Sequence, residues 1–481
     1  MKIEGQIMDP KEVFNPDKAT EYTFQERQIS SSSALFGDFD TYDEWLSEEI
    51  ISKTGGVIIH GLSKTGKTSL VERCFEACGE DPIWINGKEI TDVNDFWSGV
   101  RAKLRIPGTV RNSNSESTSL GSTTKNTVGA ENVASVSAEI SILAGNTEVS
   151  EESYTVDSVS EIREILSLSR RPIVIDDFHH CPATVAKDIS TFLKAIVRTN
   201  LVIVVAIPAA AFDPFSATSE NSGRFRMVEI PIWEEHELAS IGENGFPRLG
   251  MDSEVANPIS NALARVVCGS PAIMQEVCLK AARQFKRKMR SNVTQSSWFR
   301  EFNDSIPHVL SQVAQDKKPT VFDELRYGKP GKGKKRLSFQ LNNPPIDAIR
   351  DRIVDQYVLV LMALGRDPEN LGFSNSRNQI RDLRMSKLAE TINYWGLCRV
   401  DKNTGIPSSK SEKLGADRIA RTVEGMGDLA QKQRELSKDD KTDPVLSYMA
   451  PVHGTANATI TVNDPIFLFY LRNVRWTEIL Q

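Results

Sequence analysis

The stretch GVIIHGLSKTGKTSLVERCF, residues 56–75, joins three different patterns in one short segment. It begins with an apolar run, continues through a turn that contains two glycines, and ends with apolar residues at helical spacing. The turn GLSKTGKT, residues 61–68, has the composition and spacing of a loop that binds phosphate groups between a strand and a helix. The sequence therefore predicts a nucleotide-binding domain built around this turn.

The residue types in this turn suit the binding of ATP with Mg²⁺. Gly61 and Gly66 allow the backbone to turn so that successive N–H groups and the helix N-terminus face the phosphates. Lys67 is long enough to reach the β and γ oxygens, and Thr68 can offer its hydroxyl to Mg²⁺. The nucleotide-binding residues predicted here are Gly61, Ser63, Lys64, Thr65, Gly66, Lys67, Thr68 and Ser69.

A second apolar run, in RRPIVIDDFHH at residues 170–180, ends in two acidic residues and resembles a Walker B strand. Asp176 is expected to complete the Mg²⁺ shell, and Asp177 to polarise the water that attacks the γ-phosphate. Because Asp is one methylene shorter than the more usual Glu at this second place, slow turnover is expected. His179 and His180 follow, and either could sense the γ-phosphate or mediate a contact, although a histidine near a strand end is more often a surface or packing residue.

Continuous apolar runs alternate with helical patterns in the first half of the chain, which predicts an α/β fold with a buried parallel sheet. The runs lie at residues 57–60, 83–86, 173–177, 201–207 and 227–230. A stretch rich in Ser, Thr, Asn and Gly, residues 108–154, interrupts the pattern and is interpreted as an insertion without chemistry. Its alternating segment ASVSAEISILAG could form a hairpin, but the flanking composition fits a surface loop at least as well.

After Pro231 the pattern becomes helical, which predicts a helical lid. A polar linker with the basic run GKPGKGKKR at 328–336 follows, and regular structure is expected to resume near Ile346. Two helices, a strand, a charged segment that runs to about Asp443, and a last strand and helix then suggest a winged helix. The predicted domains are an N-terminal segment (1–50), the nucleotide domain (51–232), the lid (233–315), the basic linker (316–345) and a winged-helix-like domain (346–481).

Composition limits the class of protein. With 481 residues, of which 40% are hydrophobic and 25% charged, the chain is expected to be globular with several domains. A net charge of -6 argues against a surface that is basic all over, so any contact with nucleic acid must be local. No apolar run approaches the roughly 20 residues of a membrane span and no signal peptide is recognisable, so a cytoplasmic location is expected. The six cysteines are interpreted as reduced core thiols.

The order of these motifs resembles that of the additional-strand P-loop ATPases, the group that contains the AAA+ and STAND proteins. ATEYTFQERQ at 19–28 is similar to the leading segment of origin-recognition-like and archaeal-type members, which would give Arg27 a place near the nucleotide. VVCGSPAIMQEVC resembles their GxP element, in which Gly269 and Pro271 would lie near the adenine or ribose. VNDPIFLFYLR at 462–472 resembles the closing helix of their winged helix, started by Asp-Pro and anchored by aromatic core residues.

The resemblance also implies an arginine that acts between subunits. SGRFRMVEIPIWEEHEL, residues 222–238, resembles the segment in which AAA+ proteins carry an arginine that reaches the nucleotide of a neighbouring copy. Arg224 is the best match and Arg226 the second, while an ordinary surface arginine is the alternative interpretation. A guanidinium suits this role because it can spread over the γ-phosphate oxygens during transfer. The choice of ATP over GTP rests on the same resemblance.

The function that the resemblance implies is an ATPase that acts as a nucleotide-dependent switch or assembly platform, in bacterial anti-phage defence or in signalling. Because no TIR, nuclease or protease motif is present, its partners would be further copies of the chain or a separate effector protein. The alternative is a DNA-acting ATPase of the origin-binding or transposition-regulator type, with the winged helix and residues 328–336 on the phosphates. A metabolic kinase is disfavoured because no acceptor pocket is recognisable.

Overall fold

The computed structural model describes residues 8–17, 19–29, 36, 38–104, 156–207, 224–285, 295–328, 337–366, 383–401, 403–436, 445–449 and 458–480. The chain divides into two compact units. The sheet unit comprises Ile29–His60 and Leu70–Glu229, and the helical unit comprises Met1–Gln28, Gly61–Ser69 and Ile230–Gln481. The predicted insertion at 108–154 and residues 329–336 of the basic run lie outside the described residues.

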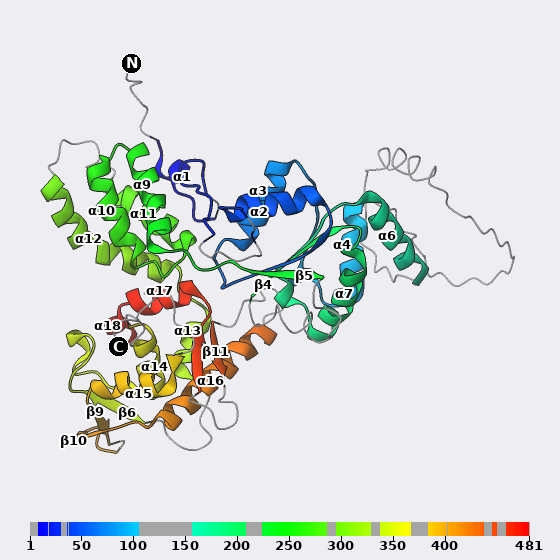
Figure 1. Ribbon diagram of the computed structural model, residues 1–481. Helices are drawn as coiled ribbons and strands as arrows, with labels where there is room; N and C mark the ends of the chain where they lie inside the picture. The colour runs from blue at the N-terminus through cyan, green and yellow to red at the C-terminus, as the bar shows by residue number, and fades with distance from the viewer. Residues whose placement is uncertain are drawn as a thin grey trace, which may run out of the picture. The chain divides into compact units, whose positions relative to one another are not determined.

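Five parallel strands form the sheet of the sheet unit, in the order β2-β3-β4-β1-β5. Figure 1 labels β4 and β5 among them. The strands are β1 Gly55–His60, β2 Ile83–Asn86, β3 Ile173–Asp176, β4 Leu201–Ala206 and β5 Phe225–Glu229. Each coincides with one predicted apolar run to within two residues at either end. Strand β4 pairs with both β1 and β3 and so separates them. This extra strand confirms the predicted fold class, an α/β P-loop sheet of the additional-strand type.

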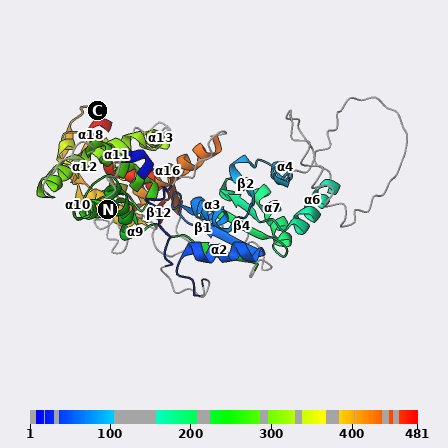
Figure 2. The same cartoon turned by 90° about the horizontal axis from the view of Figure 1, so that it is seen from above.

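Helices cover the sheet because its central strands are apolar on both faces, and every residue of β3 and β4 is buried. The helices of this unit are α2 Tyr42–Ser52, α3 Lys67–Cys78, which begins in the turn of the helical unit, α4 Val93–Leu104, α6 Val156–Ser169 and α7 Ala183–Ile196. Helix α4 lies beside α6 and α7 (Figure 1, Figure 2). Edge-to-face rings of Phe96, Trp97 and Phe192, with centroids 4.6 to 5.8 Å apart, join α4 to α7.

The carboxyl ends of the parallel strands share one edge of the sheet, which is where ligands bind in open α/β sheets. Strand β1 ends at His60, directly before the glycine turn. Strand β3 ends at Asp176, which stands in register with Asn86 at the end of β2. The strands that lead into the two predicted motifs therefore end at the same edge.

The segment predicted as a lid contains four helices in the described residues, α9 Glu235–Arg248, α10 Ser253–Ala264, α11 Pro271–Phe285 and α12 Gln295–Asp316. Helix α9 packs against α10 and α11, and the short helix α1 Pro10–Val13 contacts α11. The helical pattern predicted after Pro231 is thus confirmed. In the part of the chain that the structure describes, no helix combines the length and the apolar character that a membrane span requires.

After α12, the described residues of the helical unit form two antiparallel sheets and further helices. The sheets have the orders β10-β9-β6-β7 and β11-β12-β8. The elements are β6 Ser338–Leu341, β7 Val354–Asp355, α14 Gln356–Leu364, β8 Leu383–Arg384, α15 Met385–Tyr394, β9 Leu397–Val400, β10 Pro407–Glu412, α16 Ala416–Leu436, β11 Leu446–Met449, β12 Thr459–Val462, α17 Pro465–Asn473 and α18 Trp476–Ile479. Helix α17 begins as predicted, with the Asp464 carboxylate accepting the Ile466 N–H at 2.8 Å. It contacts α12 and α14 (Figure 1).

Two predictions about this part of the chain need correction. The segment 316–345 was expected to be a linker, but it contains helix α13, Val321–Tyr327, and strand β6, because apolar residues at short spacing are buried there. The charged segment before Asp443 contains the long helix α16. Its buried stripe, formed by Ile419, Val423, Met426 and Ala430, has helical spacing that the surrounding charges obscured.

Candidate nucleotide-binding site

The glycine turn has the backbone geometry that a phosphate-binding loop requires. Gly61 has φ +155° and Gly66 has φ +88°, and Lys64 between them adopts the left-handed conformation at φ +63°. A Cβ atom on residue 61 would collide with the carbonyl oxygen of Ile230, so only glycine fits this position. The turn therefore has a defined conformation that depends on its two glycines.

Lys67 is held against the turn although it carries a charge. Its side chain is buried, and its Nζ donates to the carbonyl oxygens of Gly61 at 3.1 Å and Leu62 at 2.7 Å. The Thr65 hydroxyl also donates to the Leu62 carbonyl, at 3.0 Å. A buried ammonium on a loop with two positive-φ glycines fits the phosphates of a nucleotide with Mg²⁺. Thr68 is half-buried and Ser69 is exposed at the start of α3.

Trp233, which the sequence analysis did not select, connects the turn to the lid. Its indole N–H donates to the Thr65 carbonyl at 3.0 Å. Its backbone N–H faces the carbonyl oxygen of Gly269 at 3.4 Å. The residue precedes α9, which begins at Glu235 with a capping box. Trp233 therefore bonds both the loop that would hold the phosphates and the predicted GxP element.

Arg27 lies over the ring of this tryptophan. Its guanidinium carbon is 5.1 Å from the centroid of the Trp233 ring, within the range of a cation–π contact. It donates to the carbonyl oxygens of Pro231 at 2.8 Å and Ile232 at 3.3 Å, and it pairs with Glu237 at 3.5 Å. Arg27 thus ties the leading segment to the connection between β5 and α9.

The GxP element has its own backbone constraint. Gly269 has φ +72° and Cys268 before it has φ +55°, so two left-handed residues precede Pro271, the first residue of α11. The Cys268 sulfur lies 3.4 Å from the Arg472 guanidinium on α17. The structure thus brings the predicted residues Arg27 and Gly269 to the glycine turn, through Trp233.

The two acids after β3 have different surroundings within the sheet unit. Asp176 is buried, and its carboxylate accepts the backbone N–H of Asp177 at 2.9 Å. Asp177 is half-buried in a left-handed conformation with φ +50°, and its carboxylate forms an ion pair with Lys88 at 3.3 Å. His179 and His180 are both buried in the short 3-10 helix Phe178–His180.

The two candidate arginines on β5 also differ. Arg224 is exposed directly before the strand and donates to the carbonyl of Lys194 at 3.2 Å. Arg226 pairs with Glu49 of α2 and lies 5.9 Å from the Trp45 ring centroid, so it holds α2 against the edge of the sheet. Arg226 therefore has a structural role at the edge of the sheet, whereas Arg224 contacts a backbone carbonyl through a hydrogen bond.

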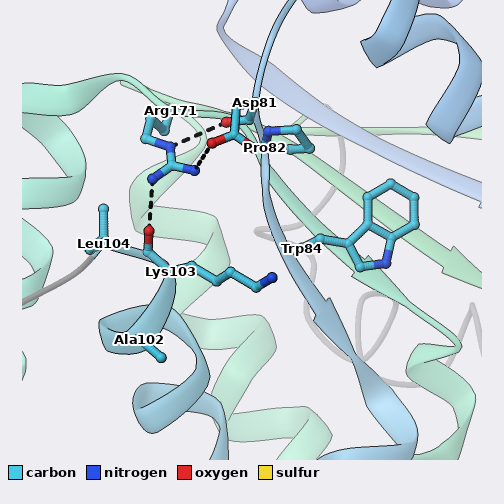
Figure 3. A pocket seen from close by; sticks show the side chains of 7 residues that line it. All are labelled: Asp81, Pro82, Trp84, Ala102, Lys103, Leu104 and Arg171. Atoms are coloured by element: carbon cyan, nitrogen blue, oxygen red, sulfur yellow. Dashed lines mark hydrogen bonds and ion pairs between the residues drawn. The ribbon is translucent and has the colours of Figure 1, made fainter. Parts of the chain in front are cut away.

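A cavity of about 750 Å³ lies elsewhere in the sheet unit, before the first residues of β2 and β3 (Figure 3). Arg171 bonds the Asp81 carboxylate at 2.7 Å and the Lys103 carbonyl at 2.8 Å, and the Trp84 ring forms another part of the lining. The amino ends of the strands lie opposite the edge at which β1 and β3 end. This cavity is therefore separate from the predicted nucleotide motifs.

Comparison with known proteins gives matches among solved structures. No protein-family model matches the chain, and no curated protein matches its sequence. The Orc2 protein of Aeropyrum pernix, solved in ADPNP–ADP complexes, is 10% identical, with 99% of this chain and 100% of that chain covered and a TM-score of 0.44. Cdc6p of Pyrobaculum aerophilum is 9% identical, with 94% and 98% covered and a TM-score of 0.37.

The RuvB Holliday junction branch migration motor of Thermotoga maritima is also similar, at 11% identity, with 60% of this chain and 74% of that chain covered and a TM-score of 0.33. The chain's own topology is the observation that assigns the fold: β4 separates β1 from β3, and the glycine turn follows β1. It gives the chain the α/β fold of an additional-strand P-loop ATPase followed by a largely helical unit.

Proposed function

We propose that the chain binds ATP with Mg²⁺ at the glycine turn and that the bound nucleotide sets the state of the helical unit. The observation that carries the proposal is Trp233, whose two N–H groups face carbonyls of the turn and of the GxP element. A ligand that reorders the turn must also affect this residue, because its bond to Thr65 would change with the loop. The proposal is therefore a switch in which a change in the conformation of the turn changes the conformation of the helical unit.

The roles within the site follow the chemistry of the residues. The backbone N–H groups of the turn and the Lys67 ammonium would bind the phosphates, and Thr68 and Asp176 would hold Mg²⁺. The bound Mg²⁺ supplies charge that offsets the negative charge of the phosphates during transfer. Asp177 would polarise the attacking water, and slow turnover fits a short carboxylate that is already paired with Lys88.

Arg224 would act on a neighbouring copy of the chain. It is exposed and directly precedes β5, which is an edge strand of the sheet in the described residues. A guanidinium in this position is accessible to a second molecule, where it would stabilise the charge on the γ-phosphate. Such a shared residue makes turnover depend on assembly. We propose anti-phage defence or signalling through a separate effector protein as the setting for this switch.

The test records mass by light scattering and phosphate release in the same sample, with ATP and Mg²⁺. Lys67→Ala is expected to abolish both assembly and turnover, and Arg224→Ala to abolish turnover. Lys187→Ala and Arg198→Ala, at exposed positions of the sheet unit, are the matched controls and should behave as the unchanged protein. Failure of the unchanged protein to bind ATP by calorimetry would contradict the nucleotide site, and retained turnover in Arg224→Ala would contradict the shared arginine.

A DNA-acting ATPase is the second candidate, supported by the five positive charges in residues 328–336. If this run and the C-terminal part bind phosphates, retention on duplex DNA must fall steeply with salt. A substitution of its lysines by glutamine should flatten that dependence. Retention that does not change with salt or with these substitutions would leave the protein-partner switch as the better proposal.

A further inference from the structure

We propose that Asp177, His179 and His180 form a binding site for a divalent transition metal such as Zn²⁺, separate in its ligands from the Mg²⁺ site proposed above. One potential ligand atom from each of the three residues lies within 4.8 Å of the other two. They belong to one short turn that follows β3, with the two histidines in the 3-10 helix Phe178–His180. The binding of the metal is independent of the proposed ATPase function, whereas its effect on turnover rests on that function.

The burial of the two histidines is the first argument. The two residues are 6% and 5% exposed, and their ring centroids are 4.1 Å apart with 44° between the ring planes. Two imidazoles side by side and next to a carboxylate form a common ligand group for transition metals.

The turn that carries the ligands is held in place by its own backbone and by neighbours. The His180 N–H donates to the Asp177 carbonyl at 2.9 Å, and the Phe178 side chain is almost fully buried. Gly87 approaches so closely that a Cβ atom there would collide with the Asp177 carbonyl oxygen. Because the backbone is fixed in this way, a metal would have to reposition mainly side chains.

The ligand set decides the class of metal. Two nitrogen donors and one carboxylate suit Zn²⁺ and similar ions and leave room for a water or a further ligand, whereas Mg²⁺ prefers oxygen ligands alone. Metal–nitrogen bonds of about 2.0 to 2.1 Å at tetrahedral angles bring ligand atoms to roughly 3.3 Å from one another. The donor atoms within 4.8 Å would therefore have to approach by about 1.5 Å at most, which rotation of the side chains can supply.

Lys88 provides a further test, because its ammonium would compete with a metal ion for the Asp177 carboxylate. Its ammonium is 3.3 Å from the Asp177 carboxylate, and its side chain is 41% exposed, so it can turn into solvent when a metal binds. Removal of this lysine should therefore strengthen metal binding. A metal that takes the Asp177 carboxylate also removes the group proposed to polarise water, so it should lower ATP turnover without blocking ATP binding.

The first experiment titrates Co²⁺ into the chelator-treated full chain and follows the visible absorption of tetrahedral Co²⁺, with competition by Zn²⁺. We expect one equivalent to bind, affinity to fall at least about tenfold in His179→Ala, His180→Ala and Asp177→Asn, and affinity to rise in Lys88→Met. His236→Ala, at a largely exposed histidine paired with Glu234, is the control and should bind as before. Circular dichroism of each variant identifies a loss of Co²⁺ affinity that comes from misfolding. His180→Gln, which keeps a polar side chain at this position, is a second test of the same ligand.

Two results would overturn the site: no Co²⁺ band beyond free ion, or a band that is unchanged in both histidine variants. The second experiment adds Zn²⁺ to the phosphate-release assay at saturating ATP and Mg²⁺. Inhibition that disappears in His179→Ala supports the link to Asp177, and equal inhibition in that variant contradicts it. A chain that binds Co²⁺ but releases no phosphate would contradict the proposed ATPase activity and leave the metal site intact.

Discussion

Substitution of Trp233 tests whether the turn and the helical unit are energetically connected. Trp233→Phe keeps an aromatic ring but removes the N–H that bonds the Thr65 carbonyl. Such a hydrogen bond contributes about 1 kcal/mol, which corresponds to roughly a fivefold change in affinity. Trp233→Ala also removes the ring that Arg27 covers, a contact of about 1 to 2 kcal/mol when partly buried. The combined loss of about 2 to 3 kcal/mol predicts a weakening of ATP binding by roughly 30- to 150-fold.

These losses of affinity are upper bounds, because the hydrogen bond from Trp233 to the Thr65 carbonyl already exists before the nucleotide binds. Only the part of its energy that orders the turn is passed on to nucleotide affinity. The measurement is isothermal titration calorimetry with a non-hydrolysable ATP analogue and Mg²⁺, with thermal unfolding recorded for each variant. Trp476→Phe, at a buried tryptophan in α18 of the same unit, is the control and should lower stability without changing affinity. An affinity within twofold of the unchanged protein in Trp233→Ala would refute the connection.

Three further predictions concern single residues. Gly61→Ala should abolish ATP binding, because the added Cβ atom would collide with the Ile230 carbonyl oxygen. Gly79→Ala is the control, because Gly79 has φ +66° but open space around it, and it should cost only about 1 kcal/mol of stability. Titration calorimetry of ATP binding and thermal unfolding compare the two variants. Burial raises the pKa of the Cys74 thiol to about 12, so this thiol should stay unmodified by iodoacetamide in the folded protein at pH 8, a result that mass spectrometry of the alkylated peptide checks. Burial also raises the pKa of Tyr470 to about 12, so the free energy of unfolding should decrease between pH 10 and 12, by up to about 1.4 kcal/mol per pH unit, because the unfolded phenol ionises first. Urea unfolding of Tyr470→Phe should show a smaller decrease over this range, and equal slopes would contradict the assignment.

The features predicted correctly from the sequence are those that depend on local patterns. Each of these features has a signal within a few residues of sequence. The glycine turn has its two spaced glycines, each of the five strands has a continuous apolar run, and the helix capped by Asp464 has an Asp-Pro pair. Helix α16 had such a signal too, in the spacing of its buried stripe from Ile419 to Ala430, but the many charges around it favoured a loop.

Trp233 could not be predicted in the same way. Its bond joins residues that are 168 positions apart, and nothing in the local sequence distinguishes this tryptophan from one that fills a core. The same holds for the ion pair between Lys88 and Asp177, because β2 and β3 come together only in the folded sheet. Sequence patterns therefore located the chemistry of the proposed site, whereas its connections required the fold.

The contacts of the glycine turn explain why it belongs to the helical unit, although it follows strand β1 of the sheet unit. Ile230 excludes a side chain at Gly61, Trp233 bonds Thr65, and the Trp233 backbone faces Gly269. Next to Gly269, Cys268 contacts Arg472 on α17, so a short series of contacts leads from the turn to the closing helix. Each step involves a backbone group or a side chain that is at least half-buried, and such contacts transmit a displacement better than exposed ones do. If the turn changes shape around ATP, the lid and the closing helix are therefore the first elements that should respond, ahead of any surface that a partner would bind.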